Sequence, residues 1–219
     1  MTVVAIDGPA GAGKSSVGRA VARALGYSYL DTGALYRAVA VAALERGIDP
    51  NDNDALARLA AALDIETEED RVRIDGRDVT EQLRDANVNS TVSIVSAHEG
   101  VRRALLRRQQ ELAEQGRIVI EGRDIGVTVA PKADVKIFLT ASLHERAQRR
   151  ALEMGIGYDD SSVVDVEQEL AARDAADGAR AASPLVRASD AVLIDSTDLT
   201  FDEVVRKVIE EVYRVADEN

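Results

Sequence analysis

The sequence of 219 residues contains no cysteine and no tryptophan, and only 3% of its residues are aromatic. Without cysteine, disulfide bonds and thiolate metal sites are excluded, which is compatible with a reducing compartment. The two histidines, His98 and His144, lie far apart in the sequence. They therefore form no H-x-x-x-H zinc motif, and we expect neither histidine to bind a metal. A G-x-S-x-G nucleophile motif is also absent.

Long apolar runs are missing as well. No uninterrupted stretch approaches the roughly 20 residues of a membrane span, and no charged and apolar leader pattern precedes the first expected strand. The formal net charge of −12 disfavours wholesale binding to nucleic acid or to an anionic membrane. We therefore expect a cytoplasmic protein that binds neither nucleic acid nor membrane. Because no long apolar face requires a partner, we also expect a monomer.

A glycine-rich loop stands near the start of the chain. Residues 8–15 read GPAGAGKS and match the phosphate-binding pattern G-x-x-x-x-G-K-[ST]. The apolar run 3–7 before the loop predicts a buried parallel strand, and apolar residues spaced by three and four after it predict a helix. The glycines allow backbone amides to surround a polyphosphate at that helix's N-terminus. In this motif Lys14 reaches the β- and γ-phosphates and Ser15 is a ligand of Mg²⁺.

The loop therefore predicts a nucleotide-binding site. The residues that we expect to contact the nucleotide are Gly8, Pro9, Ala10, Gly11, Ala12, Gly13, Lys14, Ser15 and Ser16.

The order of the remaining patterns predicts the fold class. Five short apolar segments alternate with helical patterns, and they occupy residues 3–7, 27–31, 118–120, 135–139 and 191–195. This alternation predicts an α/β fold of the P-loop NTPase type. Its five-stranded, mostly parallel sheet would lie between two helical layers in a three-layer sandwich. In such open sheets, ligands bind beyond the carboxyl ends of the strands.

Two segments depart from this rhythm. Residues 48–96 contain a helix at 54–63, a hairpin at 65–67 and 71–74, a further strand at 78–80, and polar helical segments. We interpret them as a small α/β insert in a core domain made of residues 1–47 and 97–219. Residues from about 155 to 183 form a polar helical segment with Gly155 and Gly157 at its entry. This composition is typical of a mobile lid.

Arginine positions indicate where further phosphates would bind. Only four of the 27 basic residues are lysines, a bias that genome composition can cause, so position must decide. Arg37 lies one turn inside the helix expected from residue 32 to about 45, and it either binds a second phosphate or is solvated. Arg123 and Asp124 follow the strand at 118–120, in the ligand-binding region of an open sheet. A structural ion pair is the alternative for these two residues.

Taken together, these motifs resemble the bacterial cytidylate kinase family from about Val3 to Val212. The resemblance is carried by IDGPAGAGKS at 6–15, LDTGALYR at 30–37, VRRALLRRQ at 101–109, EGRD at 121–124, Arg173-Asp174, and SPL at 183–185. The phosphate loop alone indicates only nucleotide binding. Its combination with D-T-G-A-x-Y-R and G-R-D is much more specific, and the family also carries an insert after the second helix.

The resemblance implies transfer of the γ-phosphoryl group of ATP to CMP or dCMP, with Mg²⁺, in pyrimidine nucleotide metabolism. It places the acceptor phosphate on Thr32, Arg37 and Arg123. It places cytosine among Ser93, Arg102 and Asp124. It also implies that Arg173 and Asp177 meet the ribose and the transferred phosphate, and that Arg180 closes with the lid. Lys14, Arg123, Arg173 and Arg180 would be the catalytic residues.

Two departures from the family pattern are visible, and other acceptors stay open. Relatives often carry more arginine between residues 173 and 180, where this chain has Ala175, Ala176 and Ala179. Aspartate often precedes G-R-D, where this chain has Glu121, whose longer side chain can reach Mg²⁺ through water.

The alternatives are a kinase for another small acceptor, such as UMP or AMP, or an acceptor-independent NTP-binding module. A GTPase would need an N-K-x-D segment, which the sequence lacks.

Overall fold

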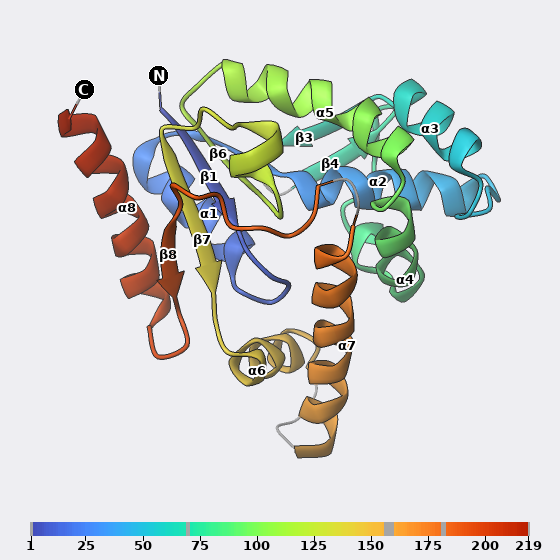
Figure 1. Ribbon diagram of the computed structural model, residues 1–219. Coiled ribbons are helices and arrows are strands. Elements are labelled where there is room, and N and C mark those ends of the chain that lie inside the picture. The colour runs from blue at the N-terminus through green and yellow to red at the C-terminus, as the bar shows by residue number, and fades with distance from the viewer. Residues whose placement is uncertain (1, 69–70, 156–159, 181–182, 219) are drawn as a thin grey trace.

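A computed structural model describes residues 2–68, 71–155, 160–180 and 183–218 (Figure 1). At its centre is a five-stranded sheet with the strand order β2-β6-β1-β7-β8. The strands are β1 (Val3–Asp7), β2 (Ser28–Asp31), β6 (Ile118–Gly122), β7 (Val135–Thr140) and β8 (Val192–Asp195). Every neighbouring pair of these strands is parallel. The structure thus confirms the predicted α/β fold with a five-stranded parallel sheet.

Helices cover both faces of the sheet. Successive residues of a strand point to opposite faces, and in β1 apolar residues lie on both faces. Val4 and Ile6 of β1 belong to one apolar cluster with α1 (Lys14–Leu25) and α8 (Phe201–Glu218). Ala5, between them, belongs to a second cluster with α2 (Thr32–Glu45) and α5 (Glu99–Glu114). Both clusters contain strand residues that are almost fully buried. The sheet is therefore the middle layer of three, as the sequence predicts.

The segment from residue 48 to 96 forms its own elements beside α2. They are α3 (Asn53–Ala62), β3 (Ile65–Glu68), β4 (Arg71–Ile74), β5 (Arg77–Asp78), a 3₁₀ turn at Gln82–Arg84, and α4 (Ala86–Val95). The three strands pair antiparallel. The expected strand at 78–80 is shorter and begins earlier, because Asp78 Oδ1 accepts hydrogen bonds from both the amide and the hydroxyl of Thr80 and turns the chain. Residues 69–70, in the predicted hairpin turn, lie outside the described residues.

Two helices lie beyond the carboxyl ends of the strands (Figure 1). They are α6 (Leu143–Glu153) and α7 (Asp160–Gly178). The helix α7 occupies most of the predicted lid, whereas residues 156–159, which include Gly157, and residues 181–182 lie outside the described part of the chain. The small apolar cluster of Ala10, Ala147, Ala151, Val163, Val166 and Leu170 joins α6, α7 and the phosphate loop.

Helix starts follow the capping residues of the sequence. The side chains of Asp31, Asp52 and Ser142 accept hydrogen bonds from the first turns of α2, α3 and α6. Thr200 and Glu203 form a capping box at α8. Among the described residues, no helix is long and apolar enough to cross a membrane.

Candidate active site

A cavity of about 590 Å³ opens at the carboxyl ends of the strands, where the phosphate loop, α2, α4 and α7 meet. It gathers most of the residues that the sequence singles out. Those that line it are Ala10, Gly11, Ala12, Gly13, Lys14, Ser15, Ser16, Thr32, Arg37, Arg102, Arg123, Asp124, Arg173, Asp177 and Arg180. Gly8, Pro9 and Ser93 are not among the described residues lining it. Residues predicted to bind the phosphoryl donor and residues predicted to bind the phosphoryl acceptor therefore line the same cavity.

The phosphate loop has the backbone that its glycines permit. Gly11 and Gly13 adopt φ values of 74° and 87°, which favour glycine. A Cβ atom on Gly8 would lie 1.9 Å from the carbonyl oxygen of Leu139. The buried Lys14 folds back over the loop, and its Nζ donates a hydrogen bond to the carbonyl oxygen of Pro9 at 2.7 Å. Burial, reinforced by the nearby Arg123 guanidinium, lowers the pKa of Lys14.

Glu121 lies buried at the end of β6, beside the loop. Its carboxylate accepts hydrogen bonds from the hydroxyls of Tyr29 and Ser15. Burial raises the pKa of Glu121, Asp31 adds to this rise, and the Lys14 ammonium opposes it. The predicted Mg²⁺ ligand, Ser15, thus touches a carboxylate. Mg²⁺ usually keeps several waters and takes one or two carboxylates together with phosphate oxygens, and this donor pair fits such a site. Among the described residues, no cluster of three or more His, Cys, Asp or Glu side chains could hold a metal without phosphate oxygens.

Thr32 and Arg37, from the start of α2, also line the cavity. Thr32 Oγ1 donates to the carbonyl oxygen of Glu121 at 2.7 Å. Arg37 donates through Nη1 to the carbonyl oxygen of Leu83, at 3.0 Å, and to the side-chain oxygen of Asn89. Burial lowers the pKa of Arg37. The side chain is thus held by two residues of the 48–96 segment while it borders the cavity.

A buried ion pair joins Arg102 of α5 to Asp124. Arg102 Nη2 lies 2.9 and 3.0 Å from the two carboxylate oxygens of Asp124, and the guanidinium carbon lies 5.3 Å from the centre of the Tyr36 ring. Arg102 Nη1 also donates to the carbonyl oxygen of Ser96 at 3.3 Å. The Nε of Arg102 is buried without a hydrogen-bond partner among the described residues. The pair therefore presents an acceptor and a donor side by side in the cavity wall.

Asp7 of β1 fixes the turn that carries Asp124. Its two oxygens accept the backbone amides of Ile125 and Gly126 at 2.7 and 2.8 Å. Those residues begin η2 (Ile125–Val129), a π-helical turn that the sequence does not predict. Burial raises the pKa of Asp7 to about 6, although both backbone hydrogen bonds oppose the rise. One carboxylate thus connects the strand before the phosphate loop to the turn after Asp124.

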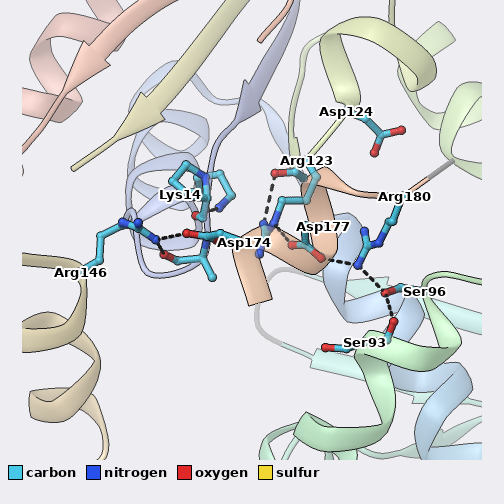
Figure 2. A network of polar contacts seen from close by, with 12 residues as sticks. Lys14, Ser93, Ser96, Arg123, Asp124, Arg146, Asp174, Asp177 and Arg180 are labelled. Carbon is cyan, nitrogen blue, oxygen red and sulfur yellow. Dashed lines mark hydrogen bonds and ion pairs between the residues drawn. The ribbon is translucent and has the colours of Figure 1, made fainter. Parts of the chain in front are cut away.

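Helix α7 and the residues just after it reach both sides of the cavity (Figure 2). Asp177 accepts from Arg123 Nε at 2.8 Å and pairs with Arg180. Arg180 Nη2 donates to the hydroxyl of Ser96 at 3.0 Å. Burial, together with the neighbouring Arg123 and Arg37, lowers the pKa of Arg173 to about 10. Four of the predicted residues, Arg123, Arg173, Asp177 and Arg180, therefore form one group.

Sequence reasoning missed several residues of this site. Ser96 is buried and lines the cavity, whereas the predicted Ser93, one helical turn earlier, is half-buried and its carbonyl oxygen accepts from the Ser96 hydroxyl at 3.3 Å. The spacing of three residues places both serines on one side of α4, which is the signal that could have found Ser96. Tyr36 stood inside a quoted motif without an assigned role. Asp7 likewise lies inside the motif at residues 6–15 without an assigned role.

A parallel sheet, a phosphate loop after its central strand, and a cavity edged with arginines define a P-loop kinase. Solved structures agree on the fold. A gluconokinase from Sinorhizobium meliloti is 18% identical, with a TM-score of 0.51 over 99% of this chain and 94% of that one. TT1252 from Thermus thermophilus is 20% identical, with a TM-score of 0.50 over 97% and 96% of the two chains. At these identities the likeness shows the fold alone.

Within this class, the chain belongs to the cytidylate kinase family, whose sequence model matches residues 4–214. Relatives named cytidylate kinase share this length. The protein of Desulforamulus reducens is 51% identical over 94% of both chains, and that of Ligilactobacillus salivarius is 48% identical over 94% of both. The family predicted from the sequence motifs is confirmed.

Proposed function

We propose that the protein transfers the γ-phosphoryl group of ATP to CMP or dCMP and releases ADP with CDP or dCDP. The observation that carries this proposal is that the phosphate loop and the Arg102–Asp124 pair line the same cavity. Membership of the cytidylate kinase family supports the same acceptor. The donor would enter on the side of the loop, and the acceptor on the side of α2 and α4.

The donor triphosphate would lie along the loop amides, with Lys14 turned from Pro9 toward the phosphates. Ser15 and Glu121 would hold Mg²⁺ together with water and phosphate oxygens. When bound, this ion neutralises charge on the phosphates. Burial disfavours the charged form of Lys14. A phosphate dianion beside it would offset this penalty and favour the protonated ammonium group.

The acceptor phosphate would bind to Thr32, Arg37 and Arg123. Phosphoryl transfer needs alignment and charge neutralisation more than covalent help from the protein. The attacking oxygen of a nucleoside monophosphate is already anionic, so no general base is required. Arg173 of α7 and Arg180, two residues beyond the end of that helix, would approach the transferred group and exclude water. Asp177 pairs with both Arg123 and Arg180, which supports this arrangement.

The base pocket would distinguish cytosine from uracil. Asp124 can accept a hydrogen bond from the exocyclic amino group of cytosine, and Arg102 can donate to its ring acceptors. Uracil presents a carbonyl oxygen in place of that amino group. Two acceptor oxygens would then face each other, and no hydrogen bond to the Asp124 carboxylate could form. The Arg102–Asp124 pair therefore favours CMP and dCMP over UMP.

The proposal is tested by measuring ADP release with CMP, dCMP, UMP or AMP as acceptor, and with no acceptor. We expect CMP and dCMP to give the highest kcat/KM and the acceptor-free rate to be negligible. A preparation of Lys14→Met, assayed in parallel, controls for contaminating kinases and should be inactive. Higher kcat/KM with UMP or AMP would reject the acceptor, and equal ADP formation without any acceptor would reject a kinase in favour of a nucleotide-binding module.

A further inference from the structure

Two aspartates one turn apart on α7 bind to different parts of the core (Figure 2). Asp177 pairs with Arg123, which follows β6 on the acceptor side. Asp174, three residues earlier and hence on the same side of the helix, turns toward the phosphate loop. There it accepts the backbone amide of Ala10 at 3.0 Å. Helix α7 is thus fastened to both halves of the proposed active site.

Both polar groups of the Ala10 backbone, the amide and the carbonyl oxygen, form hydrogen bonds with side chains. Its amide donates to Asp174 Oδ1, and its carbonyl oxygen accepts from Arg146 Nη1 at 2.8 Å. Arg146 and Asp174 in turn pair with each other at 2.5 Å. Arg146 Nε also donates to the carbonyl oxygen of Ala141, at 3.1 Å, which ties the start of α6 into the same network. Two side chains from different helices therefore define the position of this loop residue.

Close packing surrounds this network. Arg146 is only 7% exposed. A Cβ atom on Gly11 would lie 3.2 Å from Cβ of Arg146 and 3.5 Å from Leu170 Cδ1. The methyl group of Ala10 belongs to the apolar cluster of α6 and α7. The first half of the loop therefore has little room to move while α6 and α7 stay in place.

We propose that Arg146 and Asp174 are a positioning pair that holds the phosphate loop in its binding shape and couples that shape to the docking of α7. This inference rests on the proposed function of the loop as the ATP site. When α7 is docked, Arg173 borders the cavity and Ala10 is fixed; if α7 moves away, Ala10 loses its carboxylate partner. Neither Arg146 nor Asp174 is among the described residues that line the cavity, so the pair acts through the loop's position.

The coupling predicts an asymmetric effect on the two substrates. Weakening the pair should displace the loop that binds ATP. The Arg102–Asp124 pocket for the acceptor base and the Asp177–Arg123 pair at the other anchor of α7 keep their own contacts. Losing one partner of a buried ion pair leaves the other charge uncompensated. We therefore expect Asp174→Asn to weaken ATP binding and to leave the KM for CMP nearly unchanged.

The experiment compares Asp174→Asn with Asp165→Asn, the same chemical change at an exposed residue of α7. ATP affinity is measured by calorimetry with Mg²⁺ and no acceptor, and KM is measured for ATP and CMP. We expect the Kd and KM for ATP to rise about 10-fold or more in Asp174→Asn, the KM for CMP to change less than about twofold, and Asp165→Asn to match the wild type. The double variant Arg146→Met/Asp174→Asn should lose no more ATP affinity than either single variant, because the residues act as one unit.

Thermal unfolding without nucleotide shows whether Asp174→Asn is folded; if it is not, Arg146→Lys takes its place, since lysine keeps the charge but cannot reach both carbonyl oxygens at once. Unchanged ATP affinity in a folded variant, equal loss in Asp165→Asn, or independent losses in the double variant would overturn the positioning pair. A wild-type protein that fails to bind ATP would instead overturn the proposed function.

Discussion

Asp7, the last residue of β1, is a buried carboxylate whose two oxygens both accept backbone amides. Its pKa of about 6 in the folded protein lies above the value of 3.8 in an unfolded chain. The folded state therefore binds this proton more tightly than the unfolded state does. The resulting contribution to stability is complete below pH 3.8 and is lost as the pH rises to about 6.

We predict that the Asp7→Asn variant lacks this pH dependence. Relative to the variant, the unfolding free energy of the wild type without nucleotide should fall by up to about 3 kcal/mol between pH 4 and pH 6.5, since one pKa unit corresponds to 1.36 kcal/mol. Urea unfolding at a series of pH values measures the difference. Parallel profiles for the two proteins would show that Asp7 does not titrate in this window.

Residues whose role depends on nearby sequence could be predicted, and residues whose role depends on distant partners could not. Lys14 and Ser15 stand in a contiguous motif whose chemistry follows from strand, loop and helix. Asp174 meets Ala10 across 164 residues, and Asp7 meets Ile125 across 118. Such pairs arise only when the fold brings separate elements together, so the motifs that contain Asp7 and Asp174 do not reveal these partners.

Helices and strands were predictable wherever one residue type decides where they begin. Asp31, Asp52 and Ser142 each satisfy free amides of a first turn, and these starts agree with the sequence. The turn η2 was missed because its shape is imposed by Asp7 from another strand. The short β5 was misplaced by the Asp78–Thr80 turn, a local competition between side chain and backbone hydrogen bonds.

The docking of α7 onto the loop should depend on Leu170, which is 6% exposed in the small apolar cluster. We predict that Leu170→Ala destabilises α6 and α7 by about 2–4 kcal/mol, because it removes buried contacts that neighbouring alanines cannot replace. Hydrogen exchange should show the loss of protection in α6 and α7 and little change in β1 and β6. Val164→Ala, at a side chain of α7 that is 47% exposed, is the control. Equal loss of protection across the sheet would contradict local docking.

The charge of the whole molecule and the charge of its cavity have opposite signs. The chain carries a formal net charge of −12, yet Lys14, Arg37 and Arg173 face the same cavity. Burial, together with repulsion from neighbouring arginines, lowers the pKa of each of these three groups. The fold thus holds positive groups close together at an energetic cost, and binding of phosphates would relieve it. The negative net charge therefore says nothing against a small anionic substrate.

The core of the molecule runs without a break into the segment 48–96, which the sequence analysis treats as a small insert. One apolar cluster contains Ile120 of the central sheet, Val39 of α2, and Val72 and Ile74 of β4. Because α2 is shared by both parts, opening the segment would expose apolar surface of the main domain. We therefore expect it to unfold together with the main sheet, and not as a separate unit.

Native-state hydrogen exchange in low urea measures this. We predict that the slowest amides of β4 exchange with a free energy within about 1 kcal/mol of those of β6, and with the same dependence on urea, because both would open in one transition. The amides of α8 provide an internal comparison, since that helix packs on the opposite face of the sheet. A distinct opening of β3 and β4 at lower free energy, with a smaller urea dependence, would instead establish residues 48–96 as an independently unfolding insert.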